Sequence, residues 1–86
     1  MELIVPFWFK QRQAKAEPAG DHTYRVTGPI LPETFLRIRR GENGKWAAAL
    51  SMSAEGPDTA ATPAEFETEE NAWEAAFELY RQHVIT

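Results

Sequence analysis

The chain has 86 residues, of which 43% are hydrophobic and 26% are charged, and its formal net charge is −4. A domain of this size buries only about 60% of the surface of its unfolded chain, so we expect residues 1–86 to form one domain of modest stability. The absence of cysteine excludes a disulfide framework, cysteine-ligated zinc, iron–sulfur clusters and thiol catalysis. It fits a reducing compartment, and we expect a cytoplasmic protein.

Charge is divided unevenly between the two halves of the chain. Residues 1–45 carry eight Lys and Arg against five Asp and Glu, a balance of +3. Residues 46–86 carry one against eight, a balance of −7. This asymmetry is the first feature of the sequence that invites a functional hypothesis.

The N-terminal segment, residues 3–9, alternates so that both of its sides are apolar, which favours a strand covered on both faces. Pro6 has no N–H to donate, so we place this strand at a sheet edge. The segment is too short to span a membrane and lacks the basic start and cleavage site of a signal peptide. Residues 10–21 are polar and include Pro18 and Gly20, so we predict a mobile loop there.

Three further segments, residues 22–27, 34–40 and 45–53, alternate as half-buried strands do. Their alternation places a set of large apolar side chains on one common face: Tyr24, Val26, Leu36, Ile38, Trp46, Leu50 and Met52.

The turn GENGK, residues 41–45, determines the register between the last two of these strands. A two-residue loop would divide the apolar side chains between two faces. A three-residue loop, residues 42–44, pairs Ile38 with Ala48 and keeps the apolar set together. Because a slip of one residue inverts every side chain, burial favours the longer loop. Gly44 then takes the left-handed conformation of a bulge.

The C-terminal part contains a second predicted loop, residues 54–63, which has no periodicity. Residues 64–67 then form a short strand or an extended lead-in with Phe66 pointing inward. Residues 68–84 have the spacing of an amphipathic helix, with Thr68 as its N-cap. The apolar side of this helix contains Ala72, Trp73, Ala76, Phe77, Leu79, Tyr80 and Val84.

Together these elements predict an α+β fold. An antiparallel β-meander of four strands, with residues 64–67 as a candidate fifth, carries one C-terminal amphipathic helix packed on one face. The place of the N-terminal strand stays open, because pairing at an edge and folding across the second face produce the same periodicities.

No pattern in the sequence indicates catalysis, a cofactor or a metal. His22 and His83 lie in different elements, with no second histidine or cysteine at the spacing of a metal site. Asp21 and His22 are adjacent at a strand start, so we expect their side chains to diverge. The glycines do not form a phosphate-binding loop. We therefore expect a protein that is not an enzyme and has no cofactor, metal or small-molecule substrate.

The first functional hypothesis is contact with another protein or with a second copy of the chain as a homodimer. The N-terminal segment offers more apolar surface than one edge strand normally hides. The candidate interaction surface consists of Phe7, Trp8 and Phe9. No membrane contact is expected.

The second hypothesis is binding of single-stranded nucleic acid on the sheet face that points away from the helix. A shallow basic face can contact a phosphate backbone. The residues predicted there are Arg25, Arg37 and Arg39. The acidic net charge favours the first hypothesis, because nucleic-acid modules are usually basic.

Overall fold

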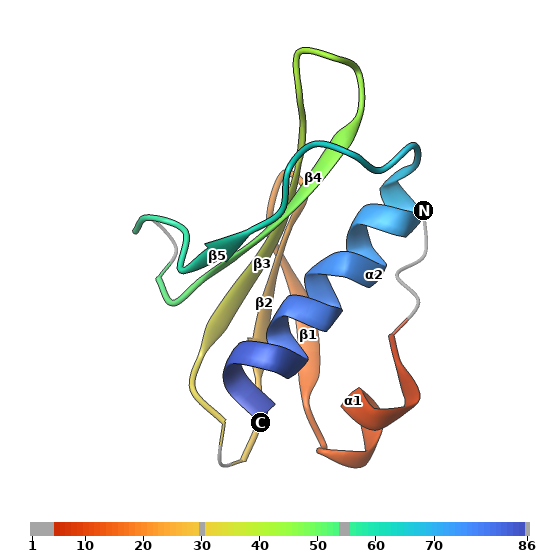
Figure 1. Cartoon of the computed structure of the whole chain (residues 1–86). Coiled ribbons are helices and arrows are strands. Elements are labelled where there is room, and N and C mark those ends of the chain that lie inside the picture. Colours follow the sequence, from red (N-terminus) through yellow and green to blue (C-terminus); the bar gives the residue numbers. More distant parts are fainter. Residues whose placement is uncertain (1–4, 30, 54–55, 86) are drawn as a thin grey trace.

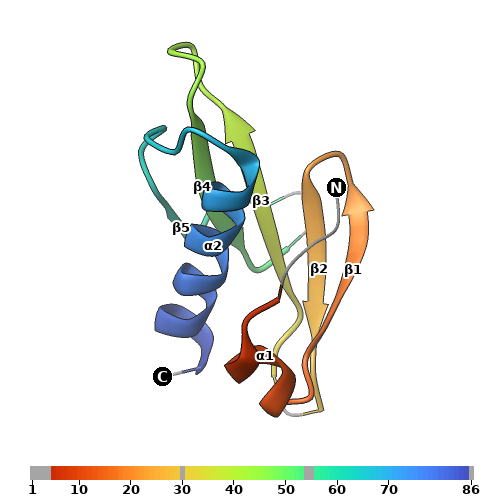
Figure 2. The ribbon, with the colours of Figure 1, turned by 90° about the vertical axis from the view of Figure 1, so that its right-hand side faces the viewer.

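The computed structural model describes residues 5–29, 31–53 and 56–85. Their elements follow one another as α1 (Phe7–Gln11), β1 (Lys15–Gly20), β2 (Thr23–Thr27), β3 (Thr34–Arg40), β4 (Trp46–Ser51), β5 (Ala60–Ala61) and α2 (Glu69–Tyr80). A π-helical turn, Arg81–Ile85, continues α2. Helix α2 crosses one face of the sheet (Figure 1). The short helix α1 lies near the C-terminal end of α2 (Figure 2).

The described strands form one antiparallel sheet in which each strand pairs with its neighbour in the sequence, in the order β1-β2-β3-β4-β5. The predicted α+β class, the meander and the helix on one face are therefore confirmed. Strands joined by short hairpins pair locally, which is why the order follows the chain.

The register of the β3–β4 hairpin is the one that burial favours. Ile38 pairs with Ala48 and Leu36 pairs with Leu50. Gly44 adopts a φ of 81°, the left-handed conformation expected of it. The turn is closed by the amide of Gly41, which donates to the carbonyl of Lys45 over 2.7 Å.

Helix α2 begins where the sequence predicts. The Thr68 hydroxyl accepts a hydrogen bond from the amide of Asn71 at 3.1 Å, which satisfies one amide of the first turn. The side chains that α2 buries are Ala72, Trp73, Ala76, Phe77 and Tyr80. They pack against a sheet face whose buried members are Val26, Leu36, Ile38, Ala48 and Leu50.

None of the helices formed by the described residues combines the length and the apolar character needed to cross a membrane.

The N-terminal segment is a helix and not the predicted edge strand, as far as it is described; residues 3 and 4 lie outside the described part. Pro6 is the N-cap of α1, and its carbonyl accepts from the amide of Phe9 at 3.1 Å. An apolar run of this length has no periodicity that separates strand from helix. The tertiary structure selects the helix because its turn directs Phe9 into the core, where it is 1% exposed.

The predicted loop at residues 10–21 is also wrong, because Lys15–Gly20 forms β1 and pairs with β2. Asp21 and His22 make the turn between them, and His22 has a φ of 52°. With Pro18 and mostly exposed side chains, the strand has an amino-acid composition that is typical of a loop. Both features are tolerated because β1 is an edge strand.

Two smaller expectations are also corrected. Ala60–Ala61, inside the predicted loop at residues 54–63, forms β5; residues 54 and 55 lie outside the described part. Of the two alternatives for residues 64–67, the structure has the extended lead-in, which contributes a single bridge from Phe66 to Trp46 and packs Phe66 against the core. Met52 was expected in the core but is 44% exposed, because β4 ends one residue before it.

Candidate interaction surface

The three aromatic residues of α1 point in three directions. Phe9 is buried with its ring centre 5.1 Å from that of Phe77. Trp8 is half-buried and stacks on Tyr80, with ring centres 6.3 Å apart and planes at 14°. Phe7 is 75% exposed. Consecutive residues on a helix are about 100° apart, so a single turn buries one side chain, half-covers the next and leaves the third in solvent.

Of the predicted surface of Phe7, Trp8 and Phe9, the structure therefore leaves only Phe7 fully at the surface. Phe9 belongs to the core, and its 1% exposure leaves almost none of its ring at the surface. Trp8 presents only part of its ring. Phe7 is the residue of the three that remains available for an interaction.

Three exposed cations lie on α1, at its C-cap and at the start of β1. Lys10 and Arg12 lie in or next to α1, and Lys15 begins β1; all three are exposed. None of the three takes part in an ion pair with another described residue. We call Phe7, Lys10, Arg12 and Lys15, together with the outer edge of β1, the α1–β1 corner.

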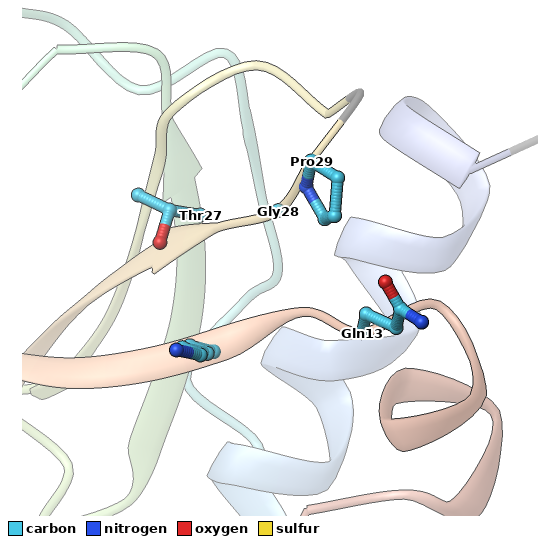
Figure 3. A pocket seen from close by; sticks show the side chains of 5 residues that line it. Gln13, Thr27, Gly28 and Pro29 are labelled. Atoms are coloured by element: carbon cyan, nitrogen blue, oxygen red, sulfur yellow. The ribbon is translucent and has the colours of Figure 1, made fainter.

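Two open hollows border this corner. One, of about 440 Å³, has an apolar wall formed by Val5, Phe9, Ala14, Ala16 and Tyr24. The other, of about 520 Å³, is lined by Gln13, Lys15, Thr27, Gly28 and Pro29 (Figure 3). Lys15 pairs with Thr27 and Ala16 with Val26. Lys15 lines both hollows, so both adjoin the start of β1.

The three arginines of the second hypothesis do lie on one sheet face, the face away from α2, but each is engaged with a carboxylate. Arg25 lies between Glu17 at 3.6 Å and Glu33 at 3.5 Å.

Arg37 and Arg39 share Asp58. Arg39 donates to both carboxylate oxygens of Asp58, at 2.6 and 3.2 Å, and Arg37 lies 3.7 Å from the same group. Arg37 also donates to the carbonyl of Ser53 at 3.3 Å. The segment that follows β4 thus folds back over this face and supplies the counter-charge. A phosphate backbone would have to displace these carboxylates, although the prediction itself stays untested.

A histidine between two carboxylates joins the β1–β2 turn to α2. The His22 ring lies 2.7 Å from Glu69 through Nε2 and 3.2 Å from Asp21 through Nδ1. The expectation that Asp21 and His22 diverge is therefore wrong. The left-handed backbone of His22 turns its ring toward both groups, and the ring also packs 5.1 Å from that of Trp46.

This cluster combines a histidine with two carboxylates. It faces an open hollow of about 280 Å³ that Tyr24 and Trp73 also line. Nε2 of His22 is hydrogen-bonded to Glu69, and Nδ1 lies beside Asp21, whose side chain is 97% exposed. Within the described ranges, no three histidine or acidic side chains are arranged to hold a metal ion.

No family model, curated protein or solved structure matches this chain. Functional inference therefore rests on the chemistry of the chain itself.

The α1–β1 corner was only partly visible in the sequence. The excess of basic residues in the first half of the chain pointed to it, as did the aromatic run. Lys15, however, lies in a segment with the composition of a loop. Its place on a sheet edge depends on pairing with β2, which no local pattern encodes.

Proposed function

We propose that this protein is a non-enzymatic, cytoplasmic interaction domain that contacts another protein, or a second copy of itself, through the α1–β1 corner. The observation that carries the proposal is the exposure of Phe7, at 75%, next to cations that have no ion pair among the described residues. A single exposed apolar side chain is common on protein surfaces. Here Phe9 and Lys10 of the same helix line an apolar hollow beside an open sheet edge, and the combination is what interfaces use.

The cations add a second support. The sheet-face arginines pair with acidic neighbours, whereas Lys10, Arg12 and Lys15 have no ion pair within the described part of the chain. Unpaired charge at the rim of an apolar contact speeds encounter and selects the partner. Basic charge from the first half of the chain is thus most available at the corner that also presents Phe7.

A photoreactive phenylalanine analogue at position 7 tests the proposal directly. Met52, which is 44% exposed away from the corner, provides the matched control position. In the source cell we expect a discrete protein adduct from position 7 and none from position 52. Light scattering of the purified chain then distinguishes a partner from a second copy. Equal labelling from the two positions, or no adduct from either, would refute the proposal.

Single-stranded nucleic acid on the sheet face is the second candidate, favoured by the alignment of Arg25, Arg37 and Arg39 on one face. It requires release of the arginines from Asp58. If it is right, Asp58→Asn tightens binding of a mixed-sequence oligonucleotide, and Arg39→Ala weakens it with a smaller salt dependence. No binding at low salt by either the wild type or Asp58→Asn removes this candidate.

A further inference from the structure

Strand β1 is an open edge of the sheet. It ends the strand order and pairs only with β2 among the described strands. Every residue of β1 except Ala16 is exposed. The outer side of such a strand presents backbone donors and acceptors that an additional strand can pair with.

The hollows beside β1 fit the side chains of an added strand. Ala16 borders the apolar hollow, and Lys15 borders both hollows. Successive side chains of a strand point to opposite faces, so a segment lying along β1 would direct one side chain into the apolar hollow beside Ala16. Its next side chain would point to the other face, toward Lys15 and Thr27.

Charge selects the chemistry of that segment. Lys15 is on the edge strand itself, Lys10 is on the adjoining helix and Arg12 is the C-cap of that helix. No acidic described residue pairs with any of the three. Glu17, the acidic residue of the same stretch of β1, also lines the apolar hollow but is paired with Arg25 at 3.6 Å. Carboxylates on the added segment would supply the missing partners. A basic segment would meet three like charges.

Pro18 limits the length of the pairing. It has no N–H, and the register of β1 shifts between Pro18 and Gly20. Prolines and bulges of this kind prevent unlimited edge-to-edge association. Regular pairing is thus confined to residues 15–17, which suits a short peptide better than a long strand.

We propose that the occupant of the α1–β1 corner is a short, extended, acidic segment of a partner protein, which pairs with residues 15–17 of β1 and inserts an apolar side chain beside Ala16. This inference rests on the proposed function and specifies its partner. A second copy of the chain and single-stranded nucleic acid are the competing occupants, and the experiment separates them.

The probe is a fluorescein-labelled peptide in which acidic and β-branched residues alternate, Glu-Val-Asp-Ile-Glu-Val-Asp. Its binding to the full chain is measured by anisotropy at about 0.15 M salt, where distant charges are screened. We expect saturable binding, and amide shifts in the NMR spectrum concentrated at residues 14–17. Lys15→Glu should weaken binding by about tenfold or more. Arg40→Glu, which reverses an exposed cation at the far end of β3, is the matched control and should weaken it by less than about twofold.

Several outcomes would overturn the inference. The first is an equal loss of peptide affinity in Lys15→Glu and Arg40→Glu, which would mean that binding depends only on the overall charge of the protein. The second is preference for the same peptide with lysine at every acidic position. A dimer that Lys15→Glu dissociates would make the occupant a second copy, and tighter binding of a single-stranded oligonucleotide at this corner would make it nucleic acid.

The proposed function can survive this test. If the acidic peptide fails to bind but position 7 still gives a discrete protein adduct, the corner is an interface for a partner of other chemistry. If position 7 gives no adduct, the proposed function fails as well. A thermal melt of Lys15→Glu completes the design; because Lys15 is exposed and has no ion pair among the described residues, its melting temperature should match that of the wild type.

Discussion

The imidazole of His22 lies 2.7 Å from the carboxylate of Glu69, although 47 positions separate them in the sequence. Through this contact the β1–β2 turn is fixed to the first turn of α2. The amide of Ile38 also donates to the His22 carbonyl at 3.1 Å. One residue in a left-handed turn thus connects the edge hairpin, the central strand and the helix.

This contact predicts a measurable coupling. His22→Ala and Glu69→Gln should each lower the free energy of unfolding, and a double-mutant cycle should give a coupling of about 0.5 kcal/mol. The value is small because both side chains are more than a third exposed and the pair is screened. Asp21→Asn is the control: its side chain is 97% exposed, and the change should alter stability by less than about 0.3 kcal/mol. Urea unfolding measures all five proteins, and strict additivity in the cycle would contradict the coupling.

Replacing two phenylalanines of α1 by alanine should lower the free energy of unfolding by very different amounts. Phe9→Ala removes a side chain that is 1% exposed and packs on Phe77, and should destabilise the fold by about 3 kcal/mol. Phe7→Ala removes an exposed ring and should change stability by no more than about 0.5 kcal/mol. Urea midpoints compare the two. Similar losses would mean that α1 packs differently from the arrangement described.

The hydroxyl of Tyr80 is buried and has no hydrogen-bond partner among the described residues. A buried polar group without a partner opposes folding. Tyr80→Phe removes only this hydroxyl and should stabilise the protein by about 1 kcal/mol, seen as a higher urea midpoint at unchanged slope. Tyr24→Phe, at a half-buried tyrosine, is the comparison and should change little. A loss of stability in Tyr80→Phe would reveal a partner for the hydroxyl, such as an ordered water.

Burial also raises the pKa of Tyr80 above its ordinary value of 10.0. In the unfolded chain the phenol ionises near that value, whereas the folded protein holds the proton to higher pH. Stability is therefore intact below about pH 10 and declines above it, by up to about 1.4 kcal/mol per pH unit from this group. Absorbance at the tyrosinate band should show one of the two tyrosines titrating late. In Tyr80→Phe the late step should vanish and the alkaline loss of stability should shrink.

The β3–β4 turn predicts a graded response at Gly44, whose φ of 81° is unfavourable for most side chains. No atom lies within 4 Å of a Cβ built there, so the cost of substitution is conformational. Gly44→Ala should destabilise by about 1 kcal/mol, and Gly44→Asn by less, because asparagine tolerates the left-handed region. Equal effects would indicate a different turn. Thermal melts of the two variants suffice.

Local periodicity determined much of this fold. The one-sided apolar pattern of α2, the Thr68 cap and the alternation of β2, β3 and β4 are properties of neighbouring residues, so they could be read directly. The register of Ile38 against Ala48 followed as well, because only one turn length buries the apolar set on a single face.

The rest depended on contacts between distant residues. Residues 7–11 form a helix because Phe9 packs against Phe77, and residues 15–20 form a strand because they pair with β2. The ion pairs of Arg37 and Arg39 with Asp58, and the exposure of Phe7 and Lys15, likewise follow from topology. Ion pairs and edges belong to the assembled sheet, because they depend on which segments meet in space, and no single segment carries that information.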